Sequence, residues 1–105
     1  MKERLRLDTA SLMAEALCAD FDRRQGVMSD GRFSLRTRAE CRYLNALLYD
    51  AVRSLCRDER EARLFMRDIG ERRGYAFSES ELSESSYKEK KAEIRRQILV
   101  RLHLV

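Results

Sequence analysis

Apolar side chains recur at helical spacing along four stretches of the chain, and the first covers residues 2–24. Six residues form its apolar stripe: Leu5, Leu12, Met13, Ala16, Leu17 and Phe21. Two arginines and then Gly26 mark its end, because basic side chains and glycine favour helix C-termini. The turn that follows centres on Asp30 and Gly31. This pair also fits a β-hairpin, but the flanking segments are too short to favour strands.

The second stretch carries the widest apolar face, which predicts the central helix of a small bundle. Thr37 and Glu40 have the spacing of a capping box, and Ser34 offers an alternative start one turn earlier. The apolar face comprises Cys41, Leu44, Leu47, Leu48, Ala51, Val52, Leu55 and Cys56. We expect this helix to end near Arg57.

A third helix is predicted to begin at Asp58, because Glu61 completes a second capping box, and to stop near Gly74. Its apolar residues are Ala62, Phe65, Met66 and Ile69. Tyr75 and Phe77 follow closely. Since two aromatic residues so near a helix end rarely stay fully exposed, we expect both to pack back onto the core.

The last helix follows a segment rich in serine and glutamate. Ser78 with Glu81 and Ser86 with Glu89 both have capping-box spacing, so a short helical turn is expected before the final helix. The apolar face of that helix comprises Tyr87, Ile94, Ile98, Leu102 and Val105. An adjacent face carries Lys88, Lys91 and Arg95.

Length and turn-forming residues define the fold class. A chain of 105 residues has room for one core, so we expect a single domain over residues 1–105. It contains no proline and only four glycines, whereas an all-β fold needs many tight turns. The sequence therefore predicts an all-α fold, a small four-helix bundle.

The basic residues are unevenly distributed between arginine and lysine. The net charge is +4, with 18 arginines and four lysines. A GC-rich coding sequence would explain the arginine excess, but it does not explain why Lys88, Lys90 and Lys91 lie together. Arginine presents a planar fork of donors that suits phosphate and carboxylate groups.

Catalytic, metal and membrane motifs are absent from the pattern. Cys18, Cys41 and Cys56 are widely spaced within apolar stretches, which favours reduced core thiols in a cytoplasmic protein. His103 is the only histidine and there is no CxxC pair, so a zinc site would lack ligands. No glycine-rich phosphate loop or apolar run of membrane-spanning length occurs. We expect a non-enzymatic protein without cofactor, metal or membrane segment.

The start of the last helix is the candidate nucleic-acid-binding site. A recognition helix needs small polar and basic residues in its first turns, where side chains reach bases and the backbone amides face phosphate. The candidate contact residues are Ser83, Ser85, Ser86, Lys88, Lys90, Lys91 and Arg95. The same serines also suit helix initiation, so a charged helix that only closes the bundle is the alternative interpretation.

Part of this segment resembles a known family. Leu82-Ser83-Glu84, Ser86-Tyr87 and Lys90-Lys91, within residues 82–94, are similar to the recognition-helix signature of phage and mobile-element regulators related to sigma-factor region 4, of the ArpU type. The resemblance implies a helix-turn-helix in the C-terminal half and DNA binding by a phage or mobile-element transcription regulator.

A second functional hypothesis is protein binding. Arginines recur along the second and third predicted helices: Arg36, Arg38, Arg42, Arg53, Arg57, Arg60, Arg63 and Arg67. Such a surface suits an acidic protein or a ribonucleoprotein. By analogy with small mobile-element proteins that inhibit host nucleases or CRISPR effectors, the chain would be a non-enzymatic inhibitor or adaptor. An exposed part of the second helix's apolar stripe would allow a homodimer.

Overall fold

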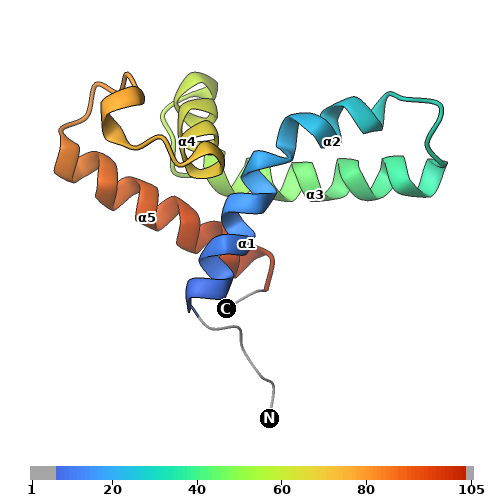
Figure 1. The fold of residues 1–105 in the computed structure, drawn as a ribbon, viewed down its shortest axis with the longest axis horizontal. Helices are drawn as coiled ribbons and strands as arrows, with labels where there is room; N and C mark the ends of the chain where they lie inside the picture. The colour runs from blue at the N-terminus through green and yellow to red at the C-terminus, as the bar shows by residue number, and fades with distance from the viewer. Residues whose placement is uncertain (1–6, 104–105) are drawn as a thin grey trace, which may run out of the picture.

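Helices account for every regular element between residues 7 and 103, the part of the chain that the computed structural model describes. In chain order these are α1 (Leu7–Ala19), α2 (Phe21–Met28), α3 (Leu35–Arg53), α4 (Glu59–Glu71), the short 3-10 helix η1 (Tyr75–Phe77) and α5 (Glu84–Arg101) (Figure 1). The predicted all-α class is confirmed. None of the described helices is both long and apolar enough to cross a membrane.

The first predicted helix is two helices in the structure, so the prediction of one continuous helix is wrong. The chain bends at Asp20, and α2 leaves the direction of α1 to run beside α3 (Figure 1). Asn45, buried on α3, donates to the backbone oxygen of Phe21 at 3.1 Å and accepts from Arg24 at 2.5 Å. These bonds hold the start of α2 on α3.

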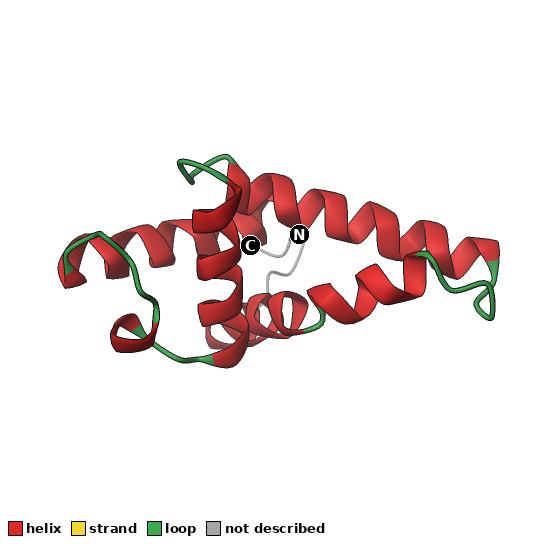
Figure 2. Ribbon diagram, turned by 90° about the horizontal axis from the view of Figure 1, so that it is seen from above, coloured by secondary structure: helices red, strands yellow, loops and turns green. Residues whose placement is uncertain are grey.

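The α2–α3 pair forms an arm that projects from the rest of the molecule. The two helices lie antiparallel and side by side, joined at the tip by residues 29–34 (Figure 2). The molecule measures 44 × 39 × 21 Å, and its radius of gyration is 14.4 Å. A packed chain of this length has a radius of gyration of about 13 Å, and the projecting arm accounts for the difference.

The core lies where α1, α4, α5 and the C-terminal half of α3 meet. The predicted apolar face of α3 is largely confirmed, since Leu48, Ala51 and Val52 are buried, although the helix ends at Arg53, before the predicted end near Arg57. The buried residues that complete the core are Ala10, Ala14, Cys18, Phe21, Cys56, Ala62, Phe65, Met66, Ile69, Tyr87, Ile94, Ile98 and Leu99.

The predicted apolar stripe of the first helix is confirmed at Phe21, which is buried, and at Leu17, which packs against the core, but it is wrong at Leu12, Met13 and Ala16. Leu12 is 54% exposed and Ala16 is exposed, whereas Ala10 and Ala14 are fully buried. Leu5 lies outside the described residues.

Short side chains set most of the helix starts. Ser34, rather than Thr37, caps α3 and accepts from the amide of Thr37 at 3.1 Å. Asp58 caps α4 as predicted and accepts from the amide of Glu61 at 2.9 Å. The cap of α5 is Ser83, which replaces the predicted start at Ser86.

The segment before α5 packs back on the core through Tyr75. Its side chain is half-buried, and its hydroxyl donates to the backbone oxygen of Leu82 at 2.7 Å. The short helical turn predicted after Ser78 lies earlier in the structure, at Tyr75–Phe77. The side chain of Phe77 and residue Val105 lie outside the described part.

Gly70 marks the closest approach of α4 to α1. A β-carbon at this position would lie 2.7 Å from the backbone nitrogen of Ala19 and 2.9 Å from its α-carbon. These atoms belong to the backbone and cannot move aside cheaply. A side chain at position 70 would therefore separate the two helices.

We predict that Gly70→Ala destabilises the protein by about 1–3 kcal/mol, because the methyl group overlaps the end of α1. Gly26→Ala is the matched control, since position 26 lies within α2 and a β-carbon there would have no neighbouring atom within 4 Å. Alanine at this position should leave stability unchanged or raise it by up to about 1 kcal/mol. Urea unfolding followed by circular dichroism measures both. Equal stability of the two variants would contradict the close packing at Gly70.

Candidate binding surfaces of α4 and α5

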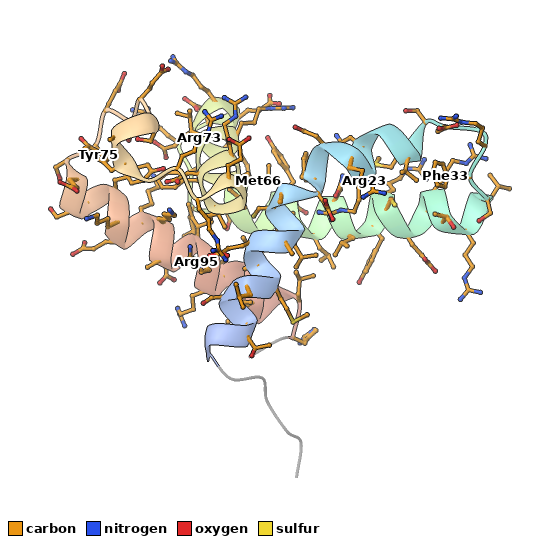
Figure 3. All side chains as sticks on the ribbon, in the orientation of Figure 1. Arg23, Phe33, Met66, Arg73, Tyr75 and Arg95 are labelled. Atoms are coloured by element: carbon orange, nitrogen blue, oxygen red, sulfur yellow. The ribbon has the colours of Figure 1, made fainter. Side chains whose placement is uncertain are left out.

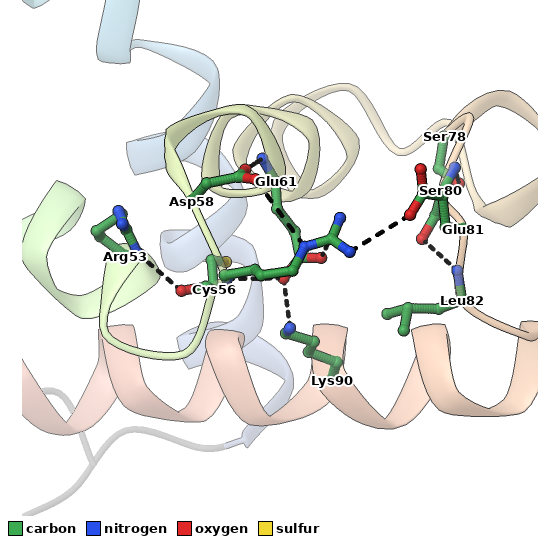
Figure 4. A network of polar contacts seen from close by, with 10 residues as sticks. Arg53, Cys56, Asp58, Glu61, Ser78, Ser80, Glu81, Leu82 and Lys90 are labelled. Carbon is green, nitrogen blue, oxygen red and sulfur yellow. Dashed lines mark hydrogen bonds and ion pairs between the residues drawn. The ribbon is translucent and has the colours of Figure 1, made fainter.

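Lys90 and Lys91, two of the predicted nucleic-acid contacts, lie against α4. Lys90 forms an ion pair with Glu61, whose side chain is 8% exposed (Figure 4). Lys91 forms an ion pair with Asp68 at 3.1 Å, and the Asp68 side chain is 2% exposed. Both ammonium groups thus neutralise carboxylates inside the fold. In the structure both side chains are directed to α4.

Asp68 is the centre of the α4–α5 contact. Its carboxylate accepts from the Tyr87 hydroxyl at 2.5 Å and from the Gly74 amide at 2.6 Å, in addition to Lys91. Burial opposes ionisation of Asp68, but these three hydrogen bonds outweigh it and hold its pKa below the usual range. The carboxylate is therefore ionised and fully partnered at neutral pH.

Glu61 links the start of α4 to the segment that precedes α5. Its carboxylate accepts from the Arg57 amide at 3.1 Å, and the Arg57 guanidinium also reaches Glu81 at 3.3 Å. Figure 4 shows Glu81 in this network together with Glu61 and Lys90. Burial again opposes ionisation, while the hydrogen bonds from Lys90 and Arg57 keep the pKa of Glu61 low.

Aromatic packing reinforces the same contact. The rings of Phe65 and Tyr87 are stacked with centroids 4.7 Å apart, and the Lys90 ammonium lies 5.9 Å from the Phe65 centroid. Burial raises the pKa of Tyr87, and the hydrogen bond to Asp68 raises it further. Tyr87 therefore stays a neutral hydroxyl donor, which the ionised Asp68 requires.

The other predicted contacts are divided between structural and exposed positions. Ser83 caps α5, and Arg95 is half-buried with its guanidinium 3.8 Å from Glu15. Ser85, Ser86 and Lys88 are exposed at the start of α5. Lys88 pairs with Glu84 at 3.1 Å, an exposed pair of the kind that contributes little to stability.

The connection from α4 to α5 is long. Residues 72–83 separate the two helices, and η1 lies within them. The helices of a helix-turn-helix are joined by a turn of about three or four residues. The α4–α5 connection therefore differs in length from the turn that the resemblance implies.

The outer face of α4 carries a row of arginines that the structure places beside a groove. Arg60, Arg63 and Arg67 are exposed and follow one another at spacings of three and four residues, so they share a helix face. Arg63 pairs with Glu59 at 3.2 Å. Among the described side chains, neither Arg60 nor Arg67 has a carboxylate oxygen within 4.0 Å.

The groove runs between α4 and the junction of α1 with α2 and has a volume of about 520 Å³. Its apolar lining includes Phe21, Leu64 and Met66, and Figure 3 shows Met66 directed into the space between α4 and this junction. The groove was not predictable from sequence periodicity, because it exists only where the chain bends at Asp20. The three arginines themselves were part of the predicted arginine surface.

Cys18 also lines the groove, and its chemistry limits what the groove does. Burial raises the pKa of its thiol to about 12. The thiol is thus protonated at neutral pH and is a poor nucleophile. Among the described residues, no group of three or more histidine, cysteine, aspartate or glutamate side chains is arranged to hold a metal ion. The groove is suited to binding.

Comparisons of the chain with protein-family models, with curated proteins and with solved structures find no match. Function is therefore inferred from the surfaces described above.

We predict that Asp68→Asn destabilises the protein at pH 7 by about 1–3 kcal/mol, because the amide loses the ion pair with Lys91 and accepts less strongly from Tyr87. The pKa of Asp68 is lowered by folding, so its contribution is complete above the unfolded-state pKa of about 4 and is lost as the pH falls through the lower folded-state value. Urea unfolding at pH 7 and at about pH 3 measures this difference.

Glu89→Gln is the control for the same charge change at an exposed position of α5, and it should leave stability nearly unchanged at both pH values. A difference between wild type and Asp68→Asn that grew on acidification would contradict the described role of the carboxylate.

Proposed function

We propose that the chain is a protein-binding module that docks an acidic partner protein on the arginine face of α4 and in the adjoining groove. The observation that carries the proposal is the pair Arg60 and Arg67. Both are exposed, share one face of α4 and have no carboxylate partner among the described side chains. Arginine with a free guanidinium beside an apolar groove is typical of residues that dominate protein–protein binding energy.

The charges around the groove favour a partner with a few carboxylates. Glu59 is paired with Arg63, and Glu71 is paired with Arg73. After these pairs are set aside, two arginines and Asp22 remain in the lining. The groove lining therefore has a small net positive charge. The partner's acidic residues would be expected to lie near the two arginines and away from Asp22.

The apolar lining favours a protein over a nucleic acid. A phosphate backbone makes no apolar contact with side chains such as Phe21, Leu64 and Met66 in the groove lining. An acidic protein segment could place an apolar side chain in the groove while its carboxylates pair with Arg60 and Arg67. The proposed role is that of a non-enzymatic inhibitor or adaptor.

The charge reversal Arg60→Glu with Arg67→Glu should weaken partner binding by at least about tenfold, since arginines at an interface centre often contribute more than about 1.4 kcal/mol. The measurement is affinity capture from nuclease-treated host lysate, followed by titration of the purified partner. Lys88→Glu with Arg101→Glu is the matched control, because it changes the net charge equally on exposed parts of α5. Equal affinities of both double variants would refute docking at α4.

DNA binding by the start of α5 is the second candidate, and one observation favours it. Ser85, Ser86 and Lys88 are exposed in the first turns of α5, where helix amides and the helix dipole favour phosphate. Lys90 and Lys91 are not part of this candidate site, because both neutralise carboxylates of α4.

For this candidate, a gel-shift assay with duplex DNA at about 50 mM salt should detect binding that weakens steeply as salt rises. Lys88→Glu should reduce the affinity, whereas Arg60→Glu with Arg67→Glu should leave it unchanged, because those arginines lie on α4. Substituting Lys90 or Lys91 is unsuitable here, since it would remove an ion pair from a buried carboxylate and affect folding. Absence of any shift at low salt would exclude this candidate.

A further inference from the structure

The outer face of α3 carries an apolar stripe that nothing in the described chain covers. Leu35 is 77% exposed and Tyr43 is 70% exposed. Ala39, between them, and Ala46, after Tyr43, are also exposed. Successive members of this set are four, four and three residues apart, so all four lie on one helix face. The stripe faces away from Leu48 and Val52, which carry the contact of α3 with the core.

The stripe lies on the arm, where no other described helix shields it. α2 covers only one side of α3, and the two helices project together from the core (Figure 1). Phe33, in the connection at the tip of the arm, is another large apolar side chain that is 42% exposed. Leu35 and Tyr43 are thus two large exposed side chains joined by alanines on one helix face, and an exposed apolar patch of this kind can serve as a binding surface.

Charges at the ends of the stripe indicate what covers it. Arg36 and Asp50 lie seven residues before and seven residues after Tyr43, so all three belong to the same helix face. Both end residues are exposed. Arg36 forms an exposed ion pair with Glu40 of its own helix at 3.1 Å, a kind of pair that contributes little to stability, and Asp50 has no ion-pair partner among the described side chains. The stripe therefore has a basic end and an acidic end, equally distant from Tyr43.

We propose that a second copy of the chain covers the stripe, with the two α3 helices antiparallel and crossing at Tyr43. In this arrangement Arg36 of each copy lies beside Asp50 of the other, so the interface contains two opposite-charge contacts. A parallel arrangement would instead place arginine beside arginine and aspartate beside aspartate. The charges of two α3 helices are thus complementary when the helices run in opposite directions.

Side-chain size supports close contact of the two helices. Ala39 and Ala46 flank Tyr43 on the same face and leave space for the larger side chains of the opposite helix. Arg42 lies at the edge of the stripe, near the crossing point, and opposes pairing by like-charge repulsion. Because one helix face is smaller than a standard interface, the dimer should be weak and depend on protein concentration.

Sedimentation velocity over about a hundredfold range of protein concentration should show the purified chain passing from monomer to dimer. Leu35→Glu with Tyr43→Glu should remain monomeric throughout, while circular dichroism confirms that the helices are intact. Both positions are exposed, so the variant is expected to fold. A wild-type chain that stays monomeric at every concentration, or a dimer that this variant does not weaken, would overturn the proposal.

Charge reversal tests the antiparallel arrangement itself. Arg36→Asp and Asp50→Arg should each weaken the dimer, because each places like charges together at both contacts. The two substitutions in one chain should restore it, since the contacts are then opposite in charge again and the net charge is that of the wild type. A double variant as weak as either single variant would overturn the antiparallel crossing. The groove on α4 is not involved, so these results are independent of partner binding there.

Discussion

Neutralisation of two buried carboxylates on α4 is the constraint on which the C-terminal half of the molecule depends. Glu61 and Asp68 lie two turns apart on the inner face of α4. Hydrogen bonds from Tyr87, Gly74 and Lys91 keep Asp68 ionised, and hydrogen bonds from Lys90 and Arg57 keep Glu61 ionised. Buried ion pairs of this kind gain little net stability, since desolvation offsets most of the attraction. Their main effect is on arrangement. Any other register of α5 on α4 would remove the lysine from each buried carboxylate and the Tyr87 hydroxyl from Asp68.

This constraint also changes how the lysine cluster is interpreted. Three lysines in a chain that otherwise uses arginine first indicate a surface that follows phosphate. In the structure the two half-buried lysines are committed to α4, and only Lys88 remains exposed. Arg60 and Arg67 on α4 are exposed arginines without an ion-pair partner among the described side chains, as are Arg23, Arg42 and Arg101 on other helices. Charge clustering in a sequence thus marks where ionised groups are needed, but it does not say whether their partners are internal or external.

Local chemistry made part of the fold predictable. The cap at Asp58 and the buried face of α3 follow from side chains within a few turns of each other, and the sequence shows both directly. The bend at Asp20 was not predictable in this way. No proline or glycine marks it, and the bond from Asn45 to Phe21 that holds α2 in place comes from 24 residues away.

The candidate surfaces were predictable only in composition. The arginine row of α4 is visible in the sequence, whereas the groove beside it depends on the bend at Asp20. The partners of Lys90 and Lys91 are 29 and 23 residues distant, so spacing along α5 gave no sign of them. In α1 the predicted face was partly wrong: Leu17 packs against the core as predicted, but Leu12 and Ala16 are exposed while Ala10 and Ala14 are buried.

Helix α3 belongs to two parts of the molecule at once. Its C-terminal half contributes Leu48, Ala51 and Val52 to the core, while its N-terminal half forms one side of the arm. Nineteen residues of uninterrupted helix correspond to a rod of roughly 28 Å. Because the helix is continuous, a force on the tip of the arm is transmitted to the core residues of α3. The arm cannot tilt as a unit without moving side chains that lie in the centre of the fold.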